Sequence, residues 1–344
     1  MIKSYSCLKR RDNREVAMQI ASKTGQWMVL FCIIIFWAVA PVYGSRAELK
    51  VIGKTEITTD TVWQGNILIT GDVRVAKGAT LLILPGTKIS FQRIKSFGDR
   101  KLSLDKANHF PRAELIIRGR LIAQGLPAKP IVFTSAEKKP AVADWGAINF
   151  IGSRYNVMEY CDISYGHTSV HCHSAQVVIS HCNFHDNGVA IGLKNVKTID
   201  LKCVVSILYN NIHNNGGGVL IGGLACPVVS HNDIRDNKFF GIFTKKSGPC
   251  CIRFNNIVGN GKGIILYAVS KLFLRDNNIA NNKDYNISLL EGQVQDVKAV
   301  NNWWGTTDPA RIRQGILDHH QDKSLGTVDF SGYLKAPVAD AGIL

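Results

Sequence analysis

A six-residue phrase that recurs about every 22 residues constrains the fold of this chain more than any other feature of its sequence. Its copies begin, in order, at Cys161, Cys182, Asn210, Asn232, Asn255 and Asn277. The central apolar residue of each copy stands at position 163, 184, 212, 234, 257 or 279, so successive steps are 21, 28, 22, 23 and 22 residues. Such a period predicts a solenoid, in which each repeat forms one coil and stacks on its neighbours.

Each repeat is too short for a pair of helices. A representative unit offers three apolar segments, at 254–257, 263–266 and 272–274. Helical repeats need units of about 34 or 40 residues with an apolar period of about 3.6, and neither is evident. We therefore predict an all-β fold, a right-handed parallel β-helix with about 22 residues per coil and a short C-terminal capping helix. Each coil contributes one strand to each of three sheets, and coils stack about 4.8 Å apart.

The alternation of side chains along a strand assigns the repeated asparagines to the interior. Residues two positions apart share a face, so the first residue of each phrase points inward if the central apolar residue does. Buried amides are costly singly, but stacked asparagines can donate to one another in a ladder. We expect a second ladder at the turn, where Asn tolerates tight backbone angles, from Asn187, Asn215, Asn237, Asn260 and Asn282.

The sequence divides into four segments. We expect a signal peptide or N-terminal anchor at 1–44, an N-terminal cap with wide first coils at 45–150, regular coils at 151–300 and a C-terminal cap at 301–344. In the last segment Asp308 suits a helix N-cap and Pro309 the first helical position, which predicts a short helix to about Leu317. A solenoid needs such covers because its terminal coils expose unpaired strand edges.

The first 44 residues have the pattern of a targeting segment. Basic residues precede an apolar run from Trp27 to Val42, and small residues follow at Gly44 and Ala47. This order is typical of a secretory signal peptide, and an uncleaved N-terminal anchor is the alternative. Either one predicts a secreted, periplasmic or cell-envelope protein that contacts a membrane only through this segment.

Charge and cysteine content bear on partners and compartment. Six of the 41 Lys and Arg and two of the 26 Asp and Glu lie in residues 1–44, which leaves a net charge of +11 on the rest. Such a protein favours anionic partners, such as acidic polysaccharide or envelope surfaces. Nucleic acid is not expected, because the basic residues are scattered and no recognition motif occurs. Seven of the nine cysteines lie after this segment, so at least one thiol is free or intermolecular in an oxidising compartment.

The residues between the ladder positions point outward and change character along the chain. In the first four copies they include His, Tyr, Asp and Arg, whereas later copies lose that character. If the sheet is regular, His185 and His213 are neighbours at roughly 5 Å, and His181 and His231 flank Tyr209 in the adjacent row. The candidate ligand-binding residues are Tyr160, Asp162, His181, His185, Tyr209, His213, His231, Asp233 and Arg235.

Three interpretations of this outer face compete. A saccharide groove would use the aromatic faces for stacking and Asp, Asn and Arg for contacts with hydroxyl or carboxylate groups. A metal site would use paired histidines with Asp162 or Asp233, and imidazole favours borderline metals such as Zn and Cu. The third interpretation is a polar, solvated face without a ligand.

A second group of metal candidates lies just before the second copy of the phrase. His167, His171 and His173 fall in what we expect to be a turn and connecting stretch. Cys161 and Cys182 belong to the inward row, and we expect them to pack in the core or to form a coil-to-coil disulfide. No cofactor is evident from the sequence, and a divalent metal is left open.

The carboxylates offer little for catalysis. Glycoside hydrolysis needs two carboxyl groups about 5–9.5 Å apart. Asp162 and Asp233 lie three coils apart, roughly 14 Å, whereas Asp233 and Asp236 share one coil and could be close. A lyase needs a base and a group that neutralises a uronate, for which Asp233 with Arg235 is the one candidate pair. Catalytic residues are therefore left unassigned.

Several short motifs resemble those of a known superfamily. Trp63-Gln64-Gly65 and Leu84-Pro85-Gly86-Thr87 precede the asparagine coils, and Asn302-Trp303-Trp304-Gly305 follows them. Together they resemble secreted bacterial right-handed parallel β-helix repeat proteins of the pectate-lyase-like superfamily, which includes the NosD-like copper-related proteins. The resemblance implies this fold over about residues 50–335, and the fold hosts lyases, hydrolases, epimerases and adhesins.

The sequence therefore favours a secreted or envelope-associated β-helix protein that binds carbohydrate or a cell surface without catalysis. Two alternatives stay open. One is a carbohydrate-active enzyme on the same face, either a pectate-lyase-like polysaccharide lyase or a glycoside hydrolase. The other is a periplasmic protein that binds Cu or Zn. The expected partner is a polysaccharide or cell-envelope glycan, and ligand identity, disulfide pairing and oligomeric state are left open.

Overall fold

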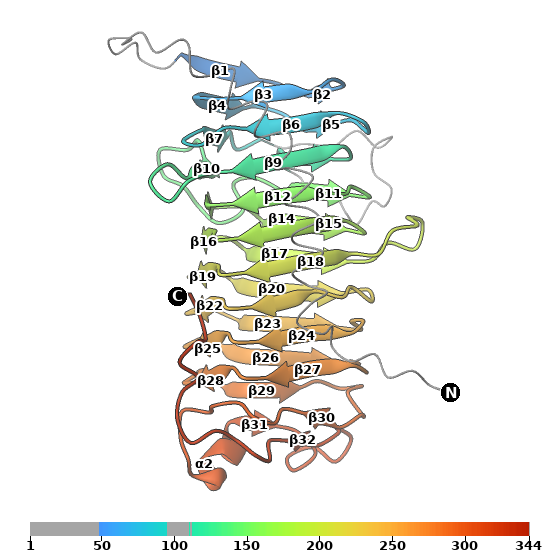
Figure 1. Ribbon diagram of the computed structural model, residues 1–344, viewed down its shortest axis with the longest axis vertical. Helices are drawn as coiled ribbons and strands as arrows, with labels where there is room; N and C mark the ends of the chain where they lie inside the picture. Colours follow the sequence, from blue (N-terminus) through green and yellow to red (C-terminus); the bar gives the residue numbers. More distant parts are fainter. Residues whose placement is uncertain (1–47, 95–109, 111, 344) are drawn as a thin grey trace. The chain divides into compact units, whose positions relative to one another are not determined.

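The computed structural model describes residues 48–94, 110 and 112–343, and the targeting segment predicted at 1–44 lies outside them. From Leu49 onward the chain winds into a stack of coils, each made of short parallel strands joined by turns (Figure 1). Successive coils hydrogen-bond to one another, so the strands of each coil extend three parallel sheets. The fold is a right-handed parallel β-helix, as predicted.

The three sheets, here called A, B and C, have 10, 11 and 9 strands within the described residues. Sheet A consists of β1 (Leu49–Ile52), β4 (Asn66–Ile69), β7 (Lys88–Phe91), β10 (Ile131–Ser135), β13 (Cys161–Ser164), β16 (Asn183–His185), β19 (Asn211–His213), β22 (Asp233–Arg235), β25 (Asn256–Val258) and β28 (Asn278–Ala280). Sheet B consists of β2 (Thr55–Ile57), β5 (Val73–Val75), β8 (Leu115–Ile117), β11 (Ile148–Ile151), β14 (Thr168–His173), β17 (Val189–Lys194), β20 (Gly217–Gly222), β23 (Phe240–Lys245), β26 (Lys262–Tyr267), β29 (Tyr285–Leu289) and β31 (Ile316–Leu317). Sheet C consists of β3 (Thr61–Trp63), β6 (Thr80–Ile83), β9 (Arg120–Gln124), β12 (Asn156–Glu159), β15 (Gln176–Ser180), β18 (Val204–Leu208), β21 (Val228–Ser230), β24 (Cys250–Arg253) and β27 (Leu272–Arg275).

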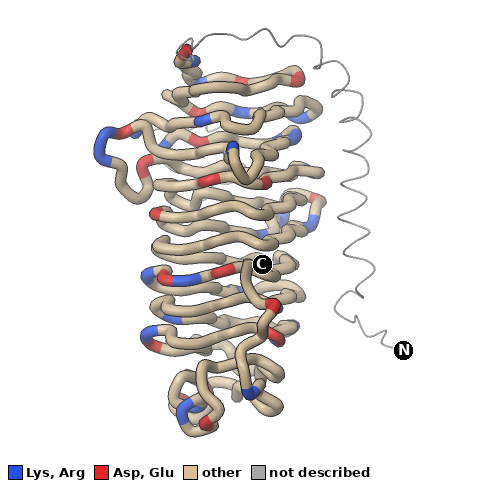
Figure 2. Tube along the Cα trace, turned by 60° about the vertical axis from the view of Figure 1, so that its left-hand side comes forward, with Lys and Arg blue, Asp and Glu red and all other residues tan. Residues whose placement is uncertain are grey.

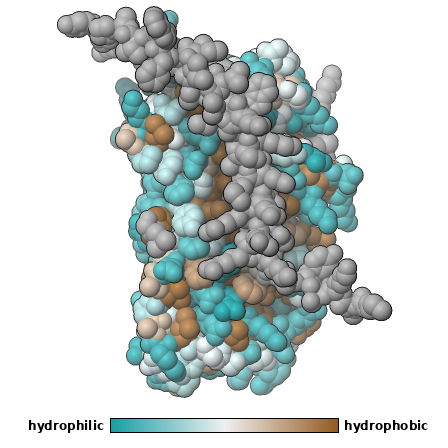
Figure 3. Space-filling view, in the orientation of Figure 1, coloured by the Kyte–Doolittle hydropathy of each residue, from teal (hydrophilic) through white to brown (hydrophobic). Residues whose placement is uncertain are grey.

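The core is built from columns of apolar side chains that repeat from coil to coil. In sheet A the central residues of the repeat, from Ile163 and Phe184 to Ile279, pair in register and are fully buried. Burial of each such side chain stabilises the fold by roughly 1.5–3 kcal/mol. The visible outer surface mixes hydrophilic and apolar residues (Figure 3), so the continuous apolar packing lies inside the coils.

Two asparagine ladders run beside this core, as predicted. In the first, Asn210, Asn232 and Asn255 each donate from the side-chain amide to the next asparagine, at 2.9 or 3.0 Å, and the ladder ends on Asn302. The second ladder runs in the same way from Asn187 to the asparagine at 282. The other amide hydrogen of Asn255 goes to backbone carbonyls. Buried polar groups are thereby satisfied, which removes the cost of burying them.

The cysteines of the described residues are free thiols. Cys161 and Cys182 occupy the inward slot that asparagine takes in later coils, and both are buried. Of the two roles predicted for them, the structure shows core packing, and the coil-to-coil disulfide is not formed. Burial raises the pKa of the Cys161 thiol well above its ordinary value, so this cysteine is expected to be unreactive.

The C-terminal end of the coils is covered by α2 (Pro309–Gln314) and by a pair of strands, β30 (Val297–Lys298) and β32 (Val328–Asp329). The side chain of Asp308 accepts a hydrogen bond from the Ala310 N–H at 2.9 Å, as predicted for the N-cap. The helix ends before the predicted Leu317, because Gly315 caps it and the next two residues join sheet B as β31. Within the described residues, no helix is long and apolar enough to cross a membrane.

Candidate functional site

A ladder of aromatic and imidazole rings runs along the turn that precedes each sheet A strand. Its members are Tyr160, His181, Tyr209, His231 and Phe254, and their ring centroids are 4.9, 5.3, 4.8 and 5.0 Å apart in that order. Each has a positive φ, between 47° and 57°, which is uncommon outside glycine. The same strained turn therefore recurs in each of these five coils and holds the rings in register. We call this set the ring ladder.

The stacking within the ring ladder changes what its members can offer a ligand. Stacked ring pairs stabilise the turn by about 0.5–1.5 kcal/mol each, but they cover one another's faces. The saccharide interpretation of the sequence places sugars on these aromatic faces, but the faces of inner members such as His181 and Tyr209 are already stacked on their neighbours. These residues present their edges instead, with a ring nitrogen and a phenol hydroxyl.

A row of amides and carboxylates runs parallel to the ring ladder on the outer face of sheet A. Its members pair in register across six strands. We call this set the amide row. It consists of a first triplet, Asp162, Asn183 and Asn211, and a second triplet, Asp233, Asn256 and Asn278.

Hydrogen bonds within each triplet run toward its carboxylate. In the first, Asn211 Nδ2 donates to Asn183 Oδ1 at 2.9 Å, and Asn183 Nδ2 donates to Asp162 Oδ2 at 2.8 Å. In the second, both corresponding distances are 2.7 Å, from Asn278 to Asn256 and from there to the carboxylate at 233. The two triplets are thus equivalent in sequence pattern and in hydrogen bonding.

The C-terminal segment covers the second triplet. It turns back from the cap and runs beside β28 and β25 toward β22 (Figure 1). Asn278 Nδ2 donates to the Val338 carbonyl at 3.1 Å and Asn256 Nδ2 to the Ala341 carbonyl at 3.2 Å. Gly342 has a φ of +90° and lies so close to Asn256 and Asp233 that a Cβ would collide with both. This contact was not predictable from the repeat pattern, because nothing in residues 334–343 repeats.

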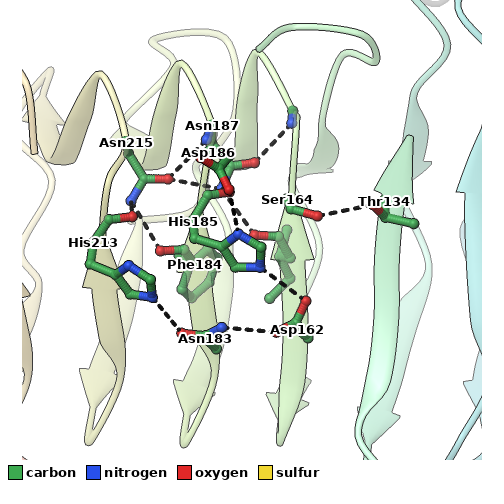
Figure 4. A network of polar contacts seen from close by, with 12 residues as sticks. Thr134, Asp162, Ser164, Asn183, Phe184, His185, Asp186, Asn187, His213 and Asn215 are labelled. Atoms are coloured by element: carbon green, nitrogen blue, oxygen red, sulfur yellow. Dashed lines mark hydrogen bonds and ion pairs between the residues drawn. The ribbon is translucent and has the colours of Figure 1, made fainter. Parts of the chain in front are cut away.

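Two imidazoles lie beside the first triplet instead of a chain segment (Figure 4). His185 Nε2 lies 3.2 Å from Asp162 Oδ1, and His185 Nδ1 lies 2.7 Å from Asp186 Oδ2. The hydrogen bond with Asp162 is the main cause that raises the pKa of His185 to about 9, against the cost of burial. His213 stacks on His185 with ring centroids 5.8 Å apart, close to the spacing predicted from the sequence. Burial lowers the pKa of His213, and the charge of Arg235 lowers it further. Of these two imidazoles, His185 alone is therefore cationic at neutral pH.

The open half of the face carries more negative than positive charge. Asp162 and Asp186 flank the single imidazolium of His185. Glu159, which the sequence analysis did not select, lies 3.8 Å from His181 Nδ1. Elsewhere Lys and Arg are spread over the coils and loops (Figure 2), so the basic net charge of the chain does not describe this site.

The structure brings the sequence-predicted residues together in three parallel rows. Tyr160, His181, Tyr209 and His231 are in the ring ladder, Asp162 and Asp233 are in the amide row, and His185, His213 and Arg235 form the third row. The predicted lyase pair does not form, since Arg235 Nη1 lies 3.3 Å from Asp236 Oδ2 and Asp233 accepts from Asn256.

The second group of histidines lies elsewhere. His167 lies in the bend before β14, in line with the predicted turn, and His171 and His173 lie on the outer face of sheet B. His171 and His173 are in β14, and the turn and connecting stretch predicted for them is wrong, because their alternation with the inward Val170 and Cys172 makes them strand residues. Their ring centroids are 4.0 Å apart, and the Phe110 ring lies tilted against the His167 ring with centroids 4.3 Å apart. These three histidines therefore do not belong to the sheet A site.

Burial keeps this histidine pair neutral. It is the main cause that lowers the pKa of His171 to about 3 and that of His173 to about 2. His173 Nδ1 is 2.9 Å from Asn149 Oδ1. Among the described residues, His171 Nδ1 and His173 Nε2 find no hydrogen-bond partner although both atoms are buried. Unpartnered buried nitrogens of this kind are available to a ligand.

These features define a right-handed parallel β-helix protein with a polar, half-covered outer face. The chain belongs to the family whose model is described as periplasmic copper-binding protein (NosD), which matches residues 135–315. A model described as pectate-lyase like beta helix domain matches residues 55–177. No curated protein sequence matches the chain significantly.

Solved structures of similar architecture include two alginate epimerases. One is the periplasmic alginate epimerase AlgG, with 10% identity and a TM-score of 0.35, over 81% of this chain and 76% of that chain. The other is the A-module of the Azotobacter vinelandii mannuronan C-5 epimerase AlgE6, with 10% identity and a TM-score of 0.37, over 85% of this chain and 91% of that chain. At such low identity the likeness concerns the fold alone.

The family description names copper, and the donor groups of the chain show whether a copper ion would fit. Within the described residues, no group of three or more His, Cys, Asp and Glu side chains converges. The donors that suit copper best are the two unpartnered nitrogens of His171 and His173. Two neutral imidazoles fit copper(I), which accepts two ligands, and fall short of the four that a structural zinc site takes. Cys172 between them points into the core and adds no donor.

Proposed function

We propose that the outer face of sheet A over β13, β16 and β19 binds a polysaccharide chain without chemical change. The observation that carries the proposal is the contrast between the two triplets. The protein's own C-terminal segment lies on the second triplet through its main-chain polar groups. The equivalent first triplet is uncovered and lies beside two imidazoles and the edges of the ring ladder.

The chemistry of the open face supports a saccharide. Sugar hydroxyls both donate and accept, and the face offers amides, carboxylates, phenol hydroxyls and ring nitrogens in rows. These rows repeat with the coil spacing of about 4.8 Å, which is close to the length of one sugar unit in an extended chain. Successive sugars can therefore meet equivalent groups on successive coils, such as Asn183 and Asn211.

The protonation states support binding rather than catalysis. Burial opposes ionisation of Asp162, but hydrogen bonds from His185 and Asn183 hold its pKa below the ordinary value, so it stays a carboxylate. His185, with a pKa raised to about 9, stays protonated at neutral pH. A general acid and base must exchange protons near the working pH, and this pair is locked as an ion pair instead.

A matched pair of variants tests the proposal. Asn211→Ala removes an amide from the open triplet, and Asn256→Ala removes the equivalent amide from the covered one. Binding of short β-1,4-linked oligosaccharides, measured by titration calorimetry on the full chain, should weaken at least tenfold in Asn211→Ala and stay within twofold of wild type in Asn256→Ala. Equal affinities in both variants, or no binding by the wild type, would overturn the proposal.

The place of action we propose is outside the cytoplasm, in the periplasm or the cell envelope. The family description supports it, together with the targeting pattern of residues 1–44. Export of the full chain with a reporter enzyme that is active only outside the cytoplasm would check it.

Copper binding at His171 and His173 is a second candidate function, which the two buried unpartnered nitrogens favour. The two imidazoles would hold a copper(I) ion, and the neutral state that burial imposes keeps both available. We expect tag-free protein to retain about one copper(I) against a chromogenic chelator, and His171→Ala or His173→Ala to lose it. His181→Ala, on sheet A, is the control. Equal retention in all four proteins would exclude this site.

A further inference from the structure

We infer that the glycan bound by this face carries a free amino group, and that its ammonium binds where the two triplets meet, at Asn211 and Asp233. This inference rests on the proposed function and names the ligand class of the same site. It follows from the direction of the hydrogen bonds in the amide row, from the comparison with the covered triplet, and from the local charges.

The amide row contains one contact, here called the junction, at which its own members cannot form a hydrogen bond. A side-chain amide has a donor side and an acceptor side, whereas a carboxylate only accepts. Two amides, Asn183 and Asn211, stand between the carboxylates of Asp162 and Asp233. Whichever way the two amides are turned, at least one contact along this stretch joins two acceptors.

The structure places this contact between Asn211 and Asp233, which are register partners on β19 and β22. Asn211 donates toward Asn183, so its oxygen faces the carboxylate. Within the described part of the chain, Asn211 Oδ1 is buried and has no hydrogen-bond partner. A buried acceptor left without a donor is unfavourable, so a ligand group that supplies a donor here gains affinity.

The covered triplet shows how such an end is filled. Asn278 is the last amide of the second triplet, as Asn211 is of the first. Its Oδ1 accepts the Val338 main-chain N–H at 2.8 Å. The same position on the open triplet therefore calls for an N–H or O–H from a ligand.

The local charges favour an ammonium over a hydroxyl. Around the junction lie the carboxylates of Asp233, Asp236 and Asp340. Two guanidiniums oppose them: Arg235, which is already paired with Asp236, and Arg253, which acts together with Asp340 on the neighbouring His231. An ammonium has three N–H groups and no acceptor, so it can donate to the Asn211 oxygen and to the Asp233 carboxylate together. For this contact the Asn211 amide must rotate about its terminal torsion, which is soft. A uronate would meet these carboxylates with like charge.

Three oligomers of equal length test the inference on the full chain: β-1,4-linked glucosamine, its N-acetylated form and galacturonate. We expect glucosamine oligomers to bind at least tenfold tighter than the N-acetylated ones, and galacturonate oligomers to bind weakest. Asp233→Asn replaces the second acceptor with an amide that can donate to Asn211, so it should keep its fold and lose the tenfold preference. Asp276→Asn, two coils away, is the matched control and should keep it.

The outcomes separate this inference from the proposed function. Equal binding of the glucosamine and N-acetylated oligomers, a preference for galacturonate, or a preference that survives in Asp233→Asn would overturn the amino-group inference while saccharide binding stands. Absence of binding by all three oligomers would overturn both.

Discussion

Val338 donates its backbone N–H to the side-chain oxygen of Asn278 at 2.8 Å. This contact fixes the C-terminal segment on the outer face of sheet A and leaves the other half of that face uncovered. One row of equivalent side chains is thereby divided into an occupied half and an open half.

Removal of residues 336–344 should lengthen the binding surface. The truncated chain would expose Asn256 and Asn278 in addition to the open triplet, so longer oligosaccharides should gain at least threefold in affinity while the shortest ones gain nothing. The lost hydrogen bonds should lower the free energy of unfolding by about 1–3 kcal/mol. Calorimetry with oligomers of increasing length checks the first effect and denaturant unfolding the second. A uniform change at all lengths would argue against a groove that the segment shortens.

Removal of a side chain from the first asparagine ladder should lower the free energy of unfolding far more than removal of one from the outer face of sheet A. Asn255 is fully buried and both donates to and accepts from its neighbours. Asn255→Ala leaves several buried groups without partners and should lower the free energy of unfolding by about 2–4 kcal/mol. Asn256→Ala, one residue away on the outer face, should cost less than about 1 kcal/mol. Urea unfolding of both variants checks this, and equal losses would contradict the ladder account.

The raised pKa of His185 predicts a specific pH dependence of stability. Its folded pKa of about 9 exceeds the ordinary 6.5, so its contribution is fully present below pH 6.5 and is lost as the pH rises to about 9. His185→Gln lacks this contribution. The difference in unfolding free energy between wild type and His185→Gln should therefore shrink across that window, as measured by denaturant unfolding at several pH values. A constant difference would mean that Asp162 and Asp186 do not hold the imidazolium.

Two substitutions of Tyr209 distinguish the structural role of the ring ladder from its role in binding. The Tyr209 ring lies between His181 and His231, so Tyr209→Ala should lower stability by about 1–3 kcal/mol through two lost stacking contacts. Tyr209→Phe keeps the ring and removes the hydroxyl, and should weaken saccharide binding at least threefold with stability unchanged. Thermal unfolding and calorimetry on both variants check this. If Tyr209→Phe binds as wild type does, the edges of the ladder do not contact the ligand.

The features that repeat were predictable from the sequence, because repetition and alternation determine register. The spacing of Asn210, Asn232 and Asn255 predicts both the coil and the ladder, and the same phase places His185 beside His213. These inferences need only the period of the repeat and the two-residue alternation of a strand.

The features that depend on the path of unrepeated segments were not predictable. Val338 and Gly342 belong to no repeat, and their docking on sheet A depends on where the cap directs the chain. Glu159 lies at the end of a sheet C strand and enters the site only because the turn brings it beside His181. The loss of the aromatic faces to mutual stacking follows from the positive φ at each turn, which residue type alone does not indicate.

A crystal structure of the full chain with a bound β-1,4-linked oligosaccharide would show where on the fold the saccharide binds. We expect sugar units over β13, β16 and β19, with hydroxyl or amino groups within hydrogen-bond distance of Asn183 and Asn211. The C-terminal segment should still lie on Asn256 and Asn278. An oligosaccharide bound on sheet B or sheet C, with the first triplet left uncovered, would contradict this expectation.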